Sequence, residues 1–171
     1  MSRVDQEILS EFLAESKSLV SEAGGILEAI EGEPKLSLRL LEYANRVDRI
    51  MGAARSLATL AGPDHALHLL GDYTGLCKAV GTRGAQLASK NEQIFDVTVS
   101  FLLDANDFIS ELLPRLDEPA SVLKKEMQGT FVDRLRWLAD LYRAAPEEKK
   151  AGPAGGLGQG EIDELLKRLG I

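Results

Sequence analysis

Apolar side chains recur at steps of three, four and seven residues along four long segments of the chain, and a glycine or a proline follows each segment closely. This spacing places the apolar groups on one face of an α-helix, whereas a half-buried β-strand would alternate every second residue. The segments span residues 5–30, 35–60, 65–80 and 85–113. Long amphipathic helices joined by short turns predict an all-α fold, namely an antiparallel four-helix bundle.

The composition argues against several classes of protein. Aromatic residues make up only 5% of the 171 residues, which disfavours a β-sandwich. The formal net charge is -7 and no basic run occurs, so we expect no nucleic-acid partner. No segment has the roughly 20 apolar residues of a membrane span, and the first residues lack a signal-peptide pattern. The single cysteine, Cys77, suits a reducing compartment, and we expect a cytoplasmic protein in which this thiol is buried.

The C-terminal part of the chain is predicted to contain three different pieces. Residues 121–144 have the spacing of a fifth helix, which would either cap the bundle or pair with a second subunit in a homodimer. Residues 146–160, PEEKKAGPAGGLGQG, have no apolar face and predict a flexible linker. Residues 161–171, EIDELLKRLGI, predict a short amphipathic helix that binds a partner's groove. The expected organisation is therefore a bundle at 1–145, a linker at 146–160 and a peptide at 161–171.

Polar side chains line one face of the second predicted helix. At about 100° per residue, Glu42, Asn45, Asp48 and Arg49 share one broad face, and Gly52 follows one turn later. The opposite face is expected to be apolar and to include Leu40, Leu41, Val47, Ile50, Met51, Ala54, Leu57 and Ala58. Two readings of Asp48 are open from its position: an ion pair with Arg49 or Arg55, or a role beside Asn45. A solvated helix edge would explain the whole row without any function.

The run from Asp48 to Leu57, DRIMGAARSL, resembles the histidine-phosphotransfer signature. The following HALHLLGDYTGL resembles the next helix of the CheA phosphotransfer domain, so the resemblance covers roughly residues 5–116. Asp48 occupies the position of the phosphoryl-accepting His, and Met51 that of the Lys. The resemblance therefore implies a bundle that docks a response-regulator receiver but lacks the imidazole that would carry the phosphoryl group.

The segment Gln159–Ile171 is similar to the C-terminal peptide of the chemotaxis phosphatase CheZ and to the N-terminal peptide of the flagellar switch protein FliM. Both of those peptides bind the response regulator CheY. The similarity implies a CheY-like partner and assigns partner contacts to Ile162, Asp163, Leu165, Leu166 and Leu169.

Glu42-x-x-Asn45 is similar to the Glu-x-x-Asn pair of the CheC and CheX phosphatases, and this similarity implies a chemotaxis phosphatase. Asn45 would position a water, Glu42 would bridge to the receiver, and Asp48 would assist, while Arg49 and Gly52 would contact the partner. We expect no cofactor and no metal site in this chain, with Mg²⁺ on the receiver. The alternative is a non-catalytic adaptor or phosphate-sink module that sequesters or localises the receiver.

Overall fold

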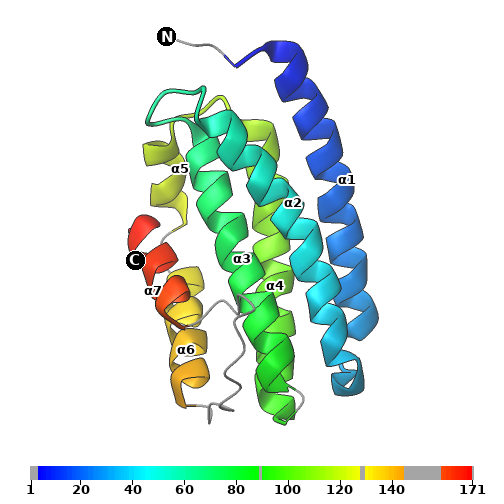
Figure 1. The fold of residues 1–171 in the computed structure, drawn as a ribbon. Coiled ribbons are helices and arrows are strands. Elements are labelled where there is room, and N and C mark those ends of the chain that lie inside the picture. Colours follow the sequence, from blue (N-terminus) through cyan, green and yellow to red (C-terminus); the bar gives the residue numbers. More distant parts are fainter. Residues whose placement is uncertain (1–3, 89, 128–129, 145–158, 171) are drawn as a thin grey trace.

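The computed structural model describes residues 4–88, 90–127, 130–144 and 159–170 (Figure 1). Within them the chain is all-α, as the sequence predicts, and forms seven α-helices and two 3₁₀-helices. In chain order these are α1 (Gln6–Ile30), η1 (Pro34–Arg39), α2 (Leu40–Ala58), α3 (Ala66–Ala88), α4 (Glu92–Leu112), η2 (Leu113–Arg115), α5 (Ala120–Glu126), α6 (Thr130–Ala144) and α7 (Gln159–Arg168). No helix in the described ranges is long and apolar enough to cross a membrane.

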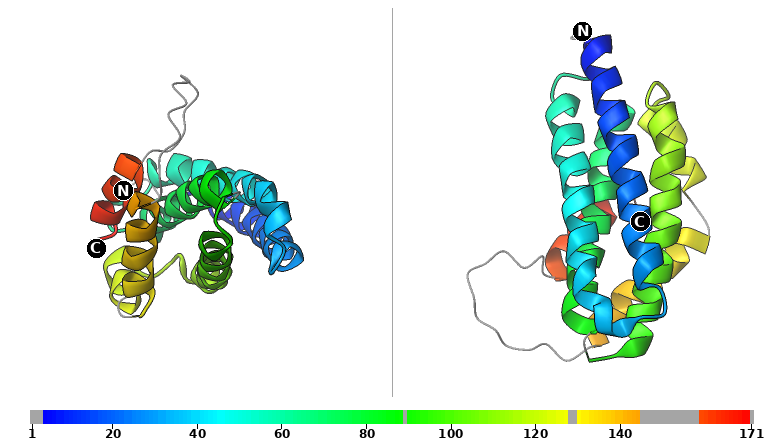
Figure 2. Two further views of the ribbon diagram at one scale, coloured as in Figure 1. Left: turned by 90° about the horizontal axis from the view of Figure 1, so that it is seen from below. Right: turned by 90° about the vertical axis from the view of Figure 1, so that its right-hand side faces the viewer.

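The four long helices α1–α4 run alternately up and down beside one another, which confirms the antiparallel arrangement (Figure 1). Figures 1 and 2 show α5, α6 and α7 on the side of this group away from α1. Helix α3 packs against α2, α4, α5 and α7 and is therefore the central helix. Its side chains are buried almost all the way round, as expected of a helix enclosed by others.

Helix α3 is longer than the sequence predicts, because it continues past Val80 to Ala88. Gly81 and Gly84 do not end the helix; they are places where a neighbour approaches closely. A Cβ at Gly81 would lie 3.2 Å from the Tyr43 ring, and one at Gly84 would lie 2.5 Å from Thr98 Cγ2. The fourth helix consequently begins at Glu92 rather than at Ala85, with Asn91 as its N-cap.

Two other predicted helices are divided. The segment 35–60 begins as the 3₁₀-helix η1, and the backbone leaves helical geometry at Leu36, so α2 begins only at Leu40. The segment 121–144 forms α5 and α6 rather than one helix. Gly129, a poor helix former, stands between them in the sequence but outside the described residues.

The first helix agrees closely with its prediction. Asp5 is its N-cap and accepts a hydrogen bond from the Glu7 amide at 2.8 Å. The helix continues through Gly24 and Gly25. At Gly24 the space that a side chain would fill is taken by Asn106 of α4, whose amide nitrogen would lie 3.1 Å from the added Cβ.

The loop before α3 contacts the start of two helices. Asp64 binds the start of α5: its carboxylate accepts from the Ser121 amide at 2.9 Å and from Ser121 Oγ at 2.7 Å. These hydrogen bonds lower the pKa of Asp64. His65 takes the capping role, because its Nδ1 accepts from the Leu67 amide at 3.2 Å. A loop residue thus holds α5 against the bundle.

Helix α6 is joined to the bundle by a buried tyrosine. The Tyr142 hydroxyl lies 2.7 Å from Thr98 Oγ1 of α4 and donates to the Val80 carbonyl of α3 at 3.3 Å. The sequence left open whether this part of the chain caps its own bundle or pairs with a second subunit. In the structure it packs on its own bundle. The predicted linker, residues 146–160, falls almost wholly outside the described residues.

Candidate functional site

The polar residues of the second predicted helix lie together on the outer face of α2. Glu42, Asn45 and Arg49 are exposed, and Asp48 is half-buried. Gly52 is also exposed, and a Cβ placed there would meet no atom within 4 Å. This face therefore has polar groups at its centre and little side-chain bulk one turn beyond Asp48.

The inward face of α2 differs from its prediction at two positions. Tyr43 is completely buried and belongs to the core, whereas Leu41, predicted to face inward, is 40% exposed. Residues two positions apart are separated by about 200° around a helix, so Tyr43 and Leu41 cannot both point into the core. Leu41 lies four residues before Asn45 and thus adds an apolar group beside the polar row.

Two charged residues of the row, Glu42 and Arg49, form exposed ion pairs. Glu42 pairs with Arg39, 3.3 Å away, and Arg49 pairs with Glu15 of α1 at 2.5 Å. Exposed ion pairs contribute only about 0–1 kcal/mol, so an incoming partner can replace either of them at small cost.

Asp48 has a different partner from those considered in the sequence. Its carboxylate accepts from Lys78 Nζ of α3 at 2.6 Å. Arg55 instead approaches Asp72 at 3.9 Å, and Arg49 turns to α1. The carboxylate of Asp48 is therefore tied to the central helix.

Asn45 has the freest polar side chain of the row. Among the residues that the structure describes, none forms a hydrogen bond with its carboxamide. The group is exposed, and a carboxamide can both donate and accept hydrogen bonds. It can therefore hold a water molecule without first breaking an internal contact.

A narrow strip of α3 brings α2 close to the C-terminal helix. A Cβ at Gly71 or at Gly75 would lie 2.9 Å from the Arg55 side chain. At Gly75 it would also lie 3.3 Å from Met51 Sδ and 3.6 Å from a methyl carbon of Leu165 in α7. The two segments that sequence similarity assigns to receiver binding, far apart along the chain, are thus neighbours across Gly75.

The apolar face of α7 is covered in this structure. Its side chains pack on α3 and α6, and their exposed fractions are 1% for Ile162, 4% for Leu165, 8% for Leu166 and 6% for Leu169. Asp163, the polar residue among the five predicted partner contacts, pairs with Arg143 of α6 at 2.5 Å. The predicted partner-binding face is therefore occupied by the bundle itself.

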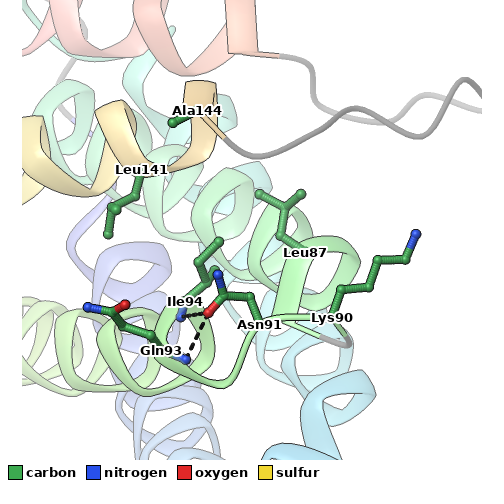
Figure 3. Close-up of a pocket in the computed structure, with 7 residues that line it drawn as sticks. All are labelled: Leu87, Lys90, Asn91, Gln93, Ile94, Leu141 and Ala144. Atoms are coloured by element: carbon green, nitrogen blue, oxygen red, sulfur yellow. Dashed lines mark hydrogen bonds between the residues drawn. The ribbon is translucent and has the colours of Figure 1, made fainter.

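The cavities described lie on other surfaces. One of about 390 Å³ opens between the start of α4 and the end of α6 and is lined by Leu87, Lys90, Asn91, Gln93, Ile94, Leu141 and Ala144 (Figure 3). Its Asn91 side chain already caps α4, with Oδ1 accepting from the Gln93 and Ile94 amides at 3.0 and 3.2 Å. The Asn91 side chain thus serves the fold.

The remaining reactive groups do not suggest a catalytic centre. Burial raises the pKa of the Cys77 thiol to about 12, which confirms that this side chain belongs to the core. Within the described ranges, no three side chains of His, Cys, Asp or Glu gather as metal ligands would. No protein-family model, curated protein sequence or solved structure matches the chain.

Lys78 is the site residue that the sequence reasoning missed. It follows Gly71 and Gly75 at steps of four and three, which places it on the same stripe of α3. Two glycines on one stripe indicate that a neighbouring helix approaches there, so this spacing could have pointed to Lys78 as the partner of an acid on α2.

Proposed function

We propose that this protein binds a phosphorylated CheY-like response regulator in chemotaxis and promotes its dephosphorylation. The bundle would serve as a histidine-phosphotransfer-like docking surface without the histidine. The observation that carries the proposal is the exposed carboxamide of Asn45 at the centre of the α2 polar face, with no hydrogen-bonding partner among the described residues.

The chemistry needs little from this chain beyond placement of a water. The oxygen of that water attacks the phosphorus in line, a new P–O bond forms, and the P–O bond to the receiver's aspartate breaks. The products are the restored aspartate carboxylate and dihydrogen phosphate, which carries both protons of the water and then gives one of them to solvent. Positioning a reactant in this way contributes a large part of many rate enhancements. Mg²⁺ bound to the receiver would stabilise the negative charge on the transferring group.

Within this proposal Asn45 orients the water and Glu42 contacts the receiver. Glu42 can do so because its ion pair with Arg39 is exposed and weak. Arg49 and Leu41 flank the carboxamide and would meet the receiver surface, while Gly52 leaves room for it. Asp48 would assist either by breaking its ion pair with Lys78 or by orienting neighbouring side chains while that pair is kept.

The pairing of Asp48 with Lys78 favours a second candidate, a non-catalytic adaptor. In the phosphotransfer resemblance Asp48 occupies the position of the reactive histidine. In this structure its side chain forms an ion pair with another residue of the same chain. A module that docks a receiver without acting on the phosphoryl group would sequester or localise it. The decay rate of the phosphorylated receiver, with and without this protein, distinguishes the two functions.

Asn45→Ala tests the catalytic proposal. We expect the rate of receiver dephosphorylation to fall roughly a hundredfold, because the water loses its positioning group. Receiver affinity should change little, since the flanking contacts remain. Gln93→Ala, which removes an exposed carboxamide from α4, is the control and should keep the full rate. Equal phosphoryl lifetimes with Asn45→Ala and with the unaltered protein would contradict the assignment.

A further inference from the structure

The C-terminal helix is held on the bundle by contacts of two kinds. Its apolar side chains pack on α3 and α6, with Leu165 seated at the bare surface of Gly75. Around them lie polar contacts: Asp163 with Arg143 at 2.5 Å and Arg168 with Asp72 at 3.8 Å. The ribbon in Figure 1 shows α7 lying along the side of the molecule formed by α3 and α6.

The polar contacts of α7 are at the surface. The side chains of Arg143 and Asp163 are 47% and 41% exposed, and that of Arg168 is 51% exposed. Solvent screens such pairs, so each one stabilises the docked position only slightly. A ten-residue helix is also marginal on its own in water, and its order therefore depends on this docking.

The docked helix cannot bind a second surface with the same face. A receiver would bind four apolar side chains of this helix, and all four are buried against the bundle: Ile162, Leu165, Leu166 and Leu169. A helix that lies in one groove must leave it before the same apolar stripe enters another.

We propose that the surface of α3 and α6 covered by α7 is a helix-binding site from which α7 can dissociate. Helix α7 acts as a latch: it must leave this site before a receiver can bind the apolar face of α7. This inference rests on the proposed function for the identity of the partner. The latch lies close to α2, because Met51 of α2 and Leu165 of α7 both approach the bare surface of Gly75. A receiver arriving at α2 would therefore be adjacent to the helix as it is released.

The latch predicts that a change which opens α7 raises the affinity of the full chain for a receiver. When only a fraction of molecules is open, the apparent affinity falls by that fraction. Arg143→Glu removes the Asp163 pair and places two acids together, so it should favour the open state. Arg136→Glu makes the same charge change at an exposed position of the same helix and is the matched control.

Two measurements on the full-length protein test the inference. Hydrogen exchange should show faster exchange of the amides of residues 162–169 in Arg143→Glu than in Arg136→Glu. Titration with a CheY-like receiver carrying beryllium fluoride as a phosphoryl mimic should show an affinity about two- to fivefold higher for Arg143→Glu than for Arg136→Glu. The free peptide of residues 159–171 is titrated alongside and should bind the receiver.

The results separate the latch from the proposed function. If the free peptide binds the receiver but the two variants bind it with equal affinity, the latch is wrong and the receiver assignment stands. Amides of residues 162–169 that already exchange in the unaltered protein at the free peptide's rate would also overturn the latch. If neither the peptide nor any full chain binds the receiver, the proposed function fails, and with it the role of the latch for that partner.

Discussion

One residue at the start of a helix forms a contact that depends on pH. It is His65, whose Nδ1 accepts the hydrogen bond that caps α3. Only an unprotonated Nδ1 can accept it. Burial, followed by the nearby His68, lowers the pKa of His65, so the folded protein favours the neutral ring.

We therefore expect His65 to make the protein less stable in mild acid. Because the folded pKa lies below the unfolded value of about 6.5, the stabilisation is complete above that value and is lost as the pH falls through it toward the folded pKa. The measurement is the free energy of unfolding between pH 7.5 and pH 5. His65→Asn keeps a capping oxygen that does not titrate, and it should show a smaller loss over this range. Identical pH dependence in both proteins would contradict the role of His65.

At the scale of helices, close approach between neighbours is set by glycines. Gly84 of α3 faces Thr98 of α4, which in turn meets the Tyr142 hydroxyl of α6. A Cβ at Gly84 would lie 2.5 Å from Thr98 Cγ2, well inside contact distance. The packing of α3, α4 and α6 therefore depends on the absence of a methyl group at Gly84.

Gly84→Ala should destabilise the protein by about 1–3 kcal/mol, because the added methyl group forces α3 and α4 apart. Gly25→Ala in α1 is the matched control. A Cβ there meets nothing within 4 Å, and alanine favours a helix over glycine by about 1 kcal/mol. The two substitutions should shift the midpoint of denaturant unfolding in opposite directions. A stabilised Gly84→Ala protein would show that the helices can separate freely there.

The helices and the site differ in how far the sequence predicted them. Strong apolar periodicity predicted α1 almost to the residue, because Asp5 is a local cap. It failed at Val80, where Gly81 looked like a helix end but is a packing contact with Tyr43. The outer face of α2 was predicted from spacing alone, whereas the Asp48–Lys78 pair and the covered face of α7 depend on which helices become neighbours. Local patterns do not contain that information.

At the scale of the whole molecule, the bundle and its C-terminal helix are held with unequal strength. Burying four apolar side chains of α7 contributes about 1.5–3 kcal/mol each. Ordering the ten residues of α7 costs about 1 kcal/mol or more each, so the two effects are of similar size. The helix therefore adds little net stability, although its apolar side chains join the same hydrophobic core as those of the other helices.

Ending the chain after residue 145 should accordingly leave the bundle folded. We expect its free energy of unfolding to change by less than about 2 kcal/mol, because the lost contacts are offset by the ordering that is no longer needed. Circular dichroism during thermal unfolding measures this. A truncated chain that loses its cooperative transition would show that the bundle needs α7 to fold.

The enclosure of α3 also bears on the ancestry of the chain. Gly71, Gly75, Gly81 and Gly84 each face a neighbour within 3.2 Å of where a side chain would begin. At Gly71 and Gly75 that neighbour is the flexible Arg55 side chain, which can move aside, whereas at Gly81 and Gly84 it is a buried side chain, Tyr43 or Thr98. A larger residue at Gly81 or Gly84 therefore requires a compensating change in another helix. Any relative that keeps the packing of α3 on α2 and α4 should accordingly retain two small residues three positions apart.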